Sequence, residues 1–306
     1  MSVAAGERPP LSALGRCEAF ARDIKVSHTV FAMPWALLST FLAARGMPHG
    51  VPYRGQVGLI LVCMVTARTL AMALNRLIDA RLDAVNPRTA RRAIPSGALK
   101  REFYWAIVAA CAAGFVLAAG GFWWEYGNPW PLALSAPVLA FLSAYPLLKR
   151  FTRLCHYYLG AALALAPVCA WVAIKGALDW PPVIMAAAVL AWTAGFDIIY
   201  ACQDYESDVK TGTFSVPARL GIARALWLAR GTHVVAAGML VLLGVVAHPP
   251  LGGLYLAGVA AAVGLLVVEH AMVKAHDLSK VNLAFFTVNG VISVIVGALG
   301  IIDVFV

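Results

Sequence analysis

The chain has 306 residues, of which 61% are hydrophobic and only 13% are charged, with a net charge of +9 and a mean hydropathy of +0.80. A soluble domain carries roughly 25% charged residues, so this composition excludes an ordinary soluble protein and indicates a polytopic membrane protein. The basic residues lie in loops between apolar stretches. Membrane topology and an anionic substrate explain that placement better than nucleic acid, which we exclude as a partner.

Nine apolar stretches approach the roughly 20 residues that a membrane-crossing helix needs. The sequence therefore predicts an all-α membrane protein with nine transmembrane helices, at 27–45, 57–78, 103–122, 130–148, 157–175, 181–203, 224–247, 251–272 and 283–303. We expect residues 1–306 to form a single integral-membrane domain that begins with a polar tail at 1–25. That tail contains no apolar run of the kind found in signal peptides, so we expect none.

Basic residues concentrate in alternate loops. The 79–102 loop carries six lysines and arginines and the 149–156 loop carries three, whereas the 121–129 and 248–250 loops carry none. Because basic loops stay on the cytoplasmic side of a membrane, this alternation predicts a cytoplasmic N-terminus. We expect a multi-pass protein of the cell inner or plasma membrane.

Two acidic clusters stand at the ends of apolar stretches on that cytoplasmic side. Asn75, Asp79 and Asp83 recur at i, i+4 and i+8, so on a helix they share one face over about 12 Å. A second face has the spacing i, i+3, i+7 and i+11, and its members are Asp197, Tyr200, Asp204 and Asp208. Carboxylates near a bilayer are costly and by default functional. Two such faces together would make a cage of oxygen ligands suited to Mg²⁺ and a diphosphate ester.

Other polar residues allow two interpretations. Asp197 lies deepest in its span and could be either functional or a helix–helix hydrogen-bonding group, and Tyr200 could be an interface aromatic. Lys149 and Arg150 follow the fourth span and could bind phosphate or simply obey topology. We interpret His28 as an interfacial group. His156 and the tryptophans are interpreted as packing or membrane-boundary groups, the tryptophans being Trp123, Trp124, Trp130 and Trp180.

These motifs resemble those of the UbiA superfamily of intramembrane aromatic prenyltransferases over nearly the whole chain. The first cluster is similar to its N-x-x-x-D-x-x-x-D motif and the second to its D-x-x-Y-x-x-x-D-x-x-x-D motif. The segments Arg88–Gly97 and Tyr145–Thr152 also match. Within the superfamily, Lys25–Pro34 and Gly195–Asp204 are similar to the 4-hydroxybenzoate polyprenyltransferase branch. Cys155-His156 replaces the Pro-Gln that is common in that branch and is similar to members proposed to act in menaquinone synthesis.

The resemblance implies a UbiA-type helical bundle around a central cavity and Mg²⁺-dependent transfer of a polyprenyl group from polyprenyl diphosphate to an aromatic acid in quinone biosynthesis. Metal ligands would be Asn75, Asp79, Asp83, Asp204 and Asp208. Asp197 and Tyr200 would be catalytic. The diphosphate would be bound by Lys25, Arg76, Arg88, Tyr145, Lys149 and Arg150. The partners would be polyprenyl diphosphate, the aromatic acid and the lipid bilayer.

Three alternatives remain open at this point. The acceptor could be 1,4-dihydroxy-6-naphthoate instead of 4-hydroxybenzoate. It could also be non-aromatic, such as a glycerol phosphate ether. A different class of protein, a cation transporter, could use the same acids as an ion pathway. The acids crowd one membrane face beside an arginine-rich loop, which would repel a permeating cation and favours an anion held by metal.

Overall fold

The computed structural model describes residues 12–25 and 31–306. Its helices are α1 (Ala13–Asp23), α2 (Met33–Ala44), α3 (Arg54–Val85), α4 (Arg101–Tyr126), α5 (Trp130–Leu148), α6 (Cys155–Lys175), α7 (Trp180–Ala201), η2 (Cys202–Asp204), α8 (Tyr205–Thr211), α9 (Val216–Leu220), α10 (Ile222–Val246), α11 (Gly253–Met272), α12 (Val281–Leu283), η3 (Ala284–Val288) and α13 (Asn289–Asp303). Within these ranges there is no β-strand, and the predicted all-α class is confirmed.

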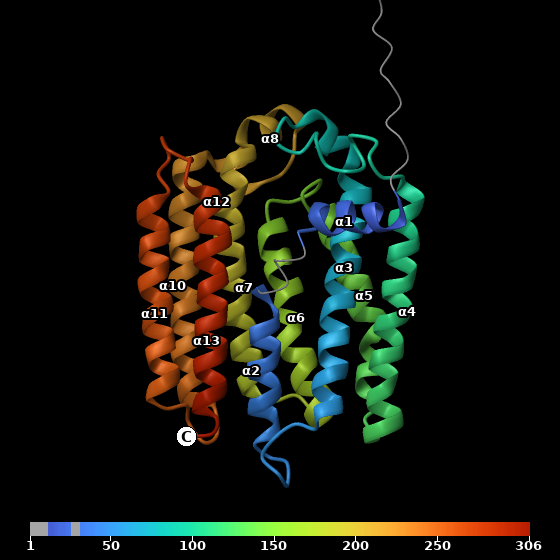
Figure 1. Cartoon of the computed structure of the whole chain (residues 1–306). Coiled ribbons are helices and arrows are strands. Elements are labelled where there is room, and N and C mark those ends of the chain that lie inside the picture. The colour runs from blue at the N-terminus through green and yellow to red at the C-terminus, as the bar shows by residue number, and fades with distance from the viewer. Residues whose placement is uncertain (1–11, 26–30) are drawn as a thin grey trace, which may run out of the picture.

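The long helices run side by side as one bundle, and α1 lies across it at the same end as α8 (Figure 1). Apolar helices suit a bilayer because each satisfies its own backbone hydrogen bonds. Glycines with positive φ close several of them, at Gly127, Gly176 and Gly212, and a glycine reaches that left-handed conformation without a Cβ clash. The largest buried core lies among α2, α6, α7, α10, α11 and α13.

Eight of the described helical segments are long and apolar enough to cross a membrane, starting with α3. The first of the nine expected spans, 27–45, contains α2, whose twelve residues extend about 18 Å and are too short to cross alone. Residues 26–30, including His28, lie outside the described residues, as do 1–11 of the tail. With eight candidate spans, the chain is a multi-pass membrane protein, and the shorter helix α2 packs inside its bundle.

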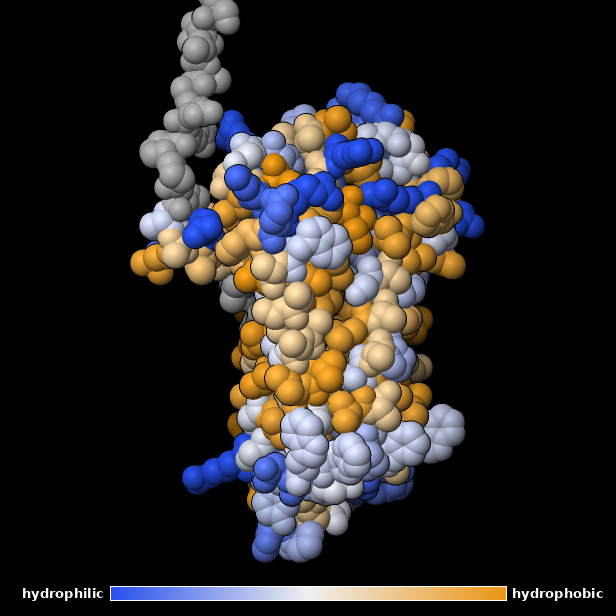
Figure 2. Space-filling model, turned by 90° about the vertical axis from the view of Figure 1, so that its right-hand side faces the viewer, coloured by the Kyte–Doolittle hydropathy of each residue, from blue (hydrophilic) through white to orange (hydrophobic). Residues whose placement is uncertain are grey.

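The surface shows the same organisation. Figure 2 shows a hydrophobic middle zone on the face in view, with most of the strongly hydrophilic side chains at one end and a few at the other. Four tryptophans expected at the membrane boundary are each more than half exposed: Trp123, Trp124, Trp130 and Trp180. Aromatic side chains of this kind are enriched where a protein meets the interface between lipid and water.

The two acid-bearing helices differ from their expected spans in opposite ways, since α3 runs past residue 78 and α7 ends before residue 203. Helix α3 continues through 32 residues to Val85 and carries the whole first cluster on one uninterrupted helix. The second cluster begins on α7, but a 3₁₀ turn (η2) interrupts the helix before α8. Asp204 ends that turn and Asp208 lies on α8, so the second cluster bends over the end of the bundle instead of following a single helix.

Helices α6 and α7 approach closely at Gly160, where an added Cβ would lie 2.4 Å from the carbonyl oxygen of Leu190. Gly160→Ala should therefore force the helices apart and cost about 1–3 kcal/mol of stability, measured as a lower midpoint of thermal inactivation in detergent. Gly238→Ala is the matched control, because a Cβ at that helical glycine meets nothing within 4 Å. Equal midpoints for the two variants would contradict the close approach.

Candidate active site

The first acidic face stands near the C-terminal end of α3. Asn75 Nδ2 donates to Asp79 Oδ2 at 2.7 Å, and Lys149 Nζ donates to the same oxygen at 2.7 Å. Asp79 is only 1% exposed, and its Oδ1 is buried without a hydrogen bond. Arg150 Nη2 lies 3.9 Å from that oxygen, beyond hydrogen-bond distance. One oxygen of this buried carboxylate is therefore left for a ligand.

The loop after α3 folds back over the acids. Arg92 Nη1 lies 2.8 Å from both oxygens of Asp83. The Thr89 hydroxyl donates to the Asp83 carbonyl at 3.1 Å and fixes the start of the loop. Asp83 is buried, so its charge depends on Arg92 for compensation.

The same loop joins the two acidic faces. Arg88 makes a two-pronged contact with Asp204, with Nε 2.8 Å from Oδ1 and Nη2 2.5 Å from Oδ2. Asn86 Nδ2 also donates to Asp204 Oδ1 at 2.8 Å, and Arg88 Nη1 donates to the Tyr200 hydroxyl at 3.0 Å. The planar guanidinium suits such paired contacts.

A polar cavity of about 170 Å³ lies between these faces. Both acidic clusters contribute to its walls, through Asn75, Asp79, Asp83, Asp204 and Asp208. The two faces therefore meet across a shared space, as the spacing of the motifs predicts. Whether these side chains ligate a metal stays a prediction.

The donor set of this cavity fits Mg²⁺ carried together with a diphosphate. In residues 12–25 and 31–306, no three side chains among His, Cys, Asp and Glu are grouped closely enough to hold one ion. Mg²⁺ usually takes one or two protein carboxylates and completes its shell with water and substrate phosphate. The unbonded Oδ1 of Asp79 is a hard donor of the required kind. The amide oxygen of Asn75 is another, and it also accepts a hydrogen bond from Arg76.

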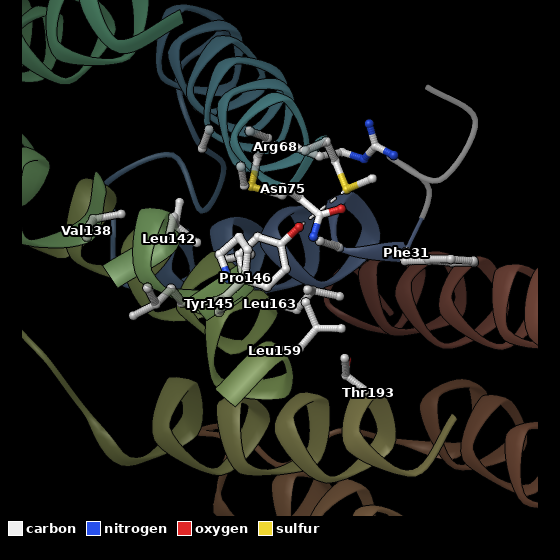
Figure 3. Close-up of a pocket in the computed structure, with 18 of the residues that line it drawn as sticks. Phe31, Arg68, Asn75, Val138, Leu142, Tyr145, Pro146, Leu159, Leu163 and Thr193 are labelled. Carbon is white, nitrogen blue, oxygen red and sulfur yellow. Dashed lines mark hydrogen bonds between the residues drawn. The ribbon is translucent and has the colours of Figure 1, made fainter. Parts of the chain in front are cut away.

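A larger cavity of about 450 Å³ adjoins the polar one. Its lining is mainly apolar and comes from α3, α4, α5, α6 and α7. In Figure 3, Tyr145 and Asn75 point toward the same space from α5 and α3, with Leu159 and Leu163 of α6 nearby. The two cavities share a rim of polar residues: Asn75, Arg92, Lys149, Asp204, Asp208 and Thr213. A molecule with a polar head and a long apolar tail would fit across that rim.

The model of the UbiA prenyltransferase family matches residues 32–291. The chain belongs to the UbiA prenyltransferase family. It is therefore a prenyltransferase, and the predicted enzyme class is confirmed.

Relatives and solved structures agree with that assignment. The 4-hydroxybenzoate octaprenyltransferase of Methylococcus capsulatus is 28% identical over 285 residues, covering 90% of this chain and 91% of the relative. A UbiA homolog from Aeropyrum pernix K1 is 30% identical with a TM-score of 0.79, covering 90% of this chain and 98% of that one. A UbiA homolog from Archaeoglobus fulgidus, solved with DMAPP and Mg²⁺, is 18% identical with a TM-score of 0.68, covering 94% and 99%.

Most of the residues predicted for the diphosphate surround the two cavities of this prenyltransferase. Lys149 lines both cavities, Arg88 lines the polar one, and Tyr145 lines the apolar one. Lys25 lines the apolar cavity with its amine 4.2 Å above the Phe286 ring. Burial, together with the charges of the neighbouring arginines, lowers the pKa of Lys25 to about 8.

Two predicted basic residues have other contacts. Arg76 lines the apolar cavity, but it is buried and donates to the Asp23 carbonyl at 3.0 Å and to Asn75 Oδ1 at 2.7 Å, so it holds Asn75 in place. Arg150 is 40% exposed, donates to the Ile78 carbonyl at 2.7 Å and lines neither cavity. Helix α5 ends at Leu148, and although both basic residues that follow it reach toward Asp79, only Lys149 lines the cavities.

Aromatic side chains close one wall of the apolar cavity. The Tyr200 ring lies 4.1 Å from that of Phe285, and Arg88 lies 5.2 Å above the Tyr200 ring. Phe285 and Phe286 lie in the π-helical turn η3. Such turns interrupt the helical register and are frequent at functional sites. Electron-rich ring faces of this kind favour a nearby cation.

The interpretation of His156 as a packing or membrane-boundary group was wrong. Its Nδ1 lies 2.6 Å from Asp197 Oδ2, and both residues line the apolar cavity. Asp197 itself is placed as expected, deep in α7 and 22% exposed. The pairing joins α6 to α7, so no local sequence pattern indicates it.

Sequence reasoning also missed Arg68. It lies on α3 two turns before Asn75, lines the apolar cavity and donates to the Lys25 carbonyl at 2.7 Å. Figure 3 shows it on the same helix as Asn75, beside the cavity. A charged residue in the middle of an apolar span, at i−7 from the first motif residue, was a usable signal.

Proposed function

We propose that this prenyltransferase transfers a polyprenyl group from polyprenyl diphosphate to an aromatic carboxylic acid of the 4-hydroxybenzoate type in ubiquinone or menaquinone synthesis, with Mg²⁺ as cofactor. The observation that carries the proposal is the polar cavity lined by acids and opening onto a long apolar cavity through a shared rim. Support comes from relatives named 4-hydroxybenzoate octaprenyltransferase and from a protein of the same fold solved with DMAPP and Mg²⁺.

The polar cavity would hold the diphosphate. Asn75, Asp79 and Asp83 on one side and Asp204 and Asp208 on the other would ligate Mg²⁺. When bound, the metal would neutralise charge on the leaving oxygens. Basic residues around the rim would contact the remaining phosphate oxygens: Lys25, Arg88, Arg92 and Lys149.

The apolar cavity would hold the prenyl tail and the acceptor ring. Arg68 is the residue we assign to the acceptor's carboxylate, because it is a cationic residue in the middle of α3 that lines this mainly apolar cavity. Ring faces of Tyr200 and Phe285 would stabilise the allylic cation. An apolar enclosure would also keep water from trapping that cation.

The assay uses purified protein in lipid nanodiscs with Mg²⁺, several prenyl diphosphates, 4-hydroxybenzoate and 1,4-dihydroxy-6-naphthoate, with products weighed by mass spectrometry. We expect prenylated 4-hydroxybenzoate and an equal amount of pyrophosphate, both lost on chelation of Mg²⁺. Prenylation of the naphthoate alone would contradict the proposed acceptor. Pyrophosphate release without any prenylated aromatic acid would contradict the proposed function.

Binding of the diphosphate should weaken as the pH rises through about 8. Below that value the Lys25 amine is protonated and attracts the anion. Above it the amine loses its charge, while the charges of Arg76, Arg88 and Arg92, which face it, do not change. The affinity of a non-reactive prenyl thiodiphosphate, measured from pH 7 to 9, should fall severalfold in the wild type and less in Lys25→Met. Parallel curves for the two proteins would contradict a role for Lys25.

The site is proposed to face the cytoplasm from a cell inner or plasma membrane. Strongly basic loops gather at the same end of the bundle as the polar cavity, including residues 86–92. The positive-inside rule places that end in the cytoplasm. Cysteine labelling from either side of inverted vesicles would test this orientation.

A further inference from the structure

The proposed function leaves one strong contact beside the apolar cavity unused, the bond between His156 and Asp197. His156 stands in the first turn of α6 and is 3% exposed. Its Nδ1 lies 2.6 Å from Asp197 Oδ2 on α7. A buried imidazole held this close to a carboxylate in a substrate-sized cavity calls for a chemical explanation.

A backbone amide fixes the tautomer of the ring. The Val216 N–H, in the first turn of α9, donates to His156 Nε2 at 3.2 Å. Because an amide N–H can only donate, Nε2 must carry a lone pair. The proton of the neutral ring is then on Nδ1, which donates it to Asp197. The imidazole is thus held at both nitrogens and cannot rotate without losing a bond.

This arrangement also orients the carboxylate. The bond to His156 uses Oδ2 of Asp197 and leaves Oδ1 for a ligand in the cavity that Asp197 lines. A general base works best when its position is fixed within hydrogen-bond reach of the proton it takes. Asp197 lies about two turns deeper along the bundle than Asp204, on the acceptor side of the shared rim.

We propose that His156 is a positioning residue for prenyl transfer, which holds Asp197 so that its second oxygen takes the proton lost by the acceptor ring. This rests on the proposed function. In the reaction, the allylic C–O bond breaks and its electron pair stays on the diphosphate. The ring carbon ortho to the hydroxyl bonds to the allylic carbon. The C–H proton at that ring carbon then passes to Asp197, and its electron pair restores the aromatic ring.

His156 could instead have a purely structural role, and an experiment must distinguish that role from the positioning of Asp197. The Cys155 thiol donates to the Phe214 carbonyl at 3.7 Å, so His156 and its neighbour both anchor residues 214–216 to α6. Loss of His156 could therefore slow the enzyme by loosening that segment. Thr213 and Ser215, beside it, line the apolar cavity.

Two variants and an isotope effect distinguish the roles. Glutamine can donate from its amide nitrogen to Asp197 and accept from Val216 through its oxygen, whereas alanine can do neither. We expect His156→Ala to lower kcat by about 10²-fold with little change in KM for the prenyl diphosphate, and His156→Gln to recover most of that loss. With an acceptor deuterated at the reacting ring carbon, His156→Ala should show a larger primary isotope effect than the wild type.

His233→Ala is the matched control. His233 is equally buried and lies 3.1 Å from the α7 carbonyl of Trp192, but does not line the apolar cavity, so its isotope effect should equal the wild type's. Equal losses in His156→Ala and His156→Gln with a wild-type isotope effect would overturn the positioning role. So would wild-type turnover by His156→Ala. Absence of prenylated product from the wild type itself would instead overturn the proposed function.

Discussion

Asp79→Asn is expected to lower turnover by about 10³-fold or more, the order seen when a group that stabilises transition-state charge is removed. Asp79 is buried, shares Oδ2 with Asn75 and Lys149, and keeps Oδ1 unbonded. An amide would retain the shape but remove the charge that a divalent ion needs. Asp204→Asn should behave in the same way, because Asp204 stands on the opposite wall of the polar cavity. Product formation and pyrophosphate release are measured with excess Mg²⁺.

The control for these variants is Asp179→Asn. Asp179 is exposed before α7, at the opposite end of that helix from Asp204, and forms an ion pair with Lys175 at 3.5 Å. The Asp179→Asn protein should be present in the membrane in the same amount as the two site variants and should keep wild-type activity. Normal turnover by Asp79→Asn at saturating Mg²⁺ would remove Asp79 from the metal role.

Arg68→Gln should lower kcat/KM for the aromatic acid by about 10²-fold, which corresponds to about 2.7 kcal/mol. Leaving a carboxylate without its buried cation costs about 2–5 kcal/mol, a range that includes this value. The loss should appear mainly in KM for the acid, and the affinity for prenyl diphosphate should change little. A neutral acceptor, the amide of 4-hydroxybenzoate, should lose much less, because it offers no charge for Arg68 to pair with.

Arg45→Gln is the control for this effect. Arg45 donates to the Pro249 carbonyl at 2.7 Å, far from both cavities. In Arg45→Gln, kcat/KM for the acid and kcat/KM for the amide should both stay close to their wild-type values. An equal loss for both acceptors in Arg68→Gln would show that Arg68 supports the fold around Lys25 instead of recognising a carboxylate.

The parts of this molecule that follow from local spacing were predictable. Hydrophobic runs located the helices, and the interval between Asn75, Asp79 and Asp83 placed them on one face because α3 is regular there. The second cluster was less regular, since the 3₁₀ turn before α8 depends on how the chain packs over the bundle end. The first span was overestimated for a related reason: hydropathy counts apolar residues and does not show where a helix begins.

The residues that were missed owe their roles to non-local contacts. His156 meets Asp197 only because α6 and α7 pack against each other, and Arg92 reaches Asp83 only because the loop after α3 turns back. Lys149 and Arg150 are neighbours with the same charge, yet only Lys149 faces the cavities. Which of them does so depends on where α5 ends, and the charge pattern alone cannot decide it.

The acids of the polar cavity already have internal counterions, Lys149 for Asp79, Arg92 for Asp83 and Arg88 for Asp204. A divalent cation arriving alone would have to compete with these amines and guanidinium groups, and an anion arriving alone would have to draw them from the acids. When the cation and the anion bind together, the metal ion coordinates the carboxylates and the phosphates pair with the basic side chains. Neither set of charged side chains is then left without a partner. We therefore expect strongly synergistic capture, in which neither species binds well by itself and the pair is held tightly.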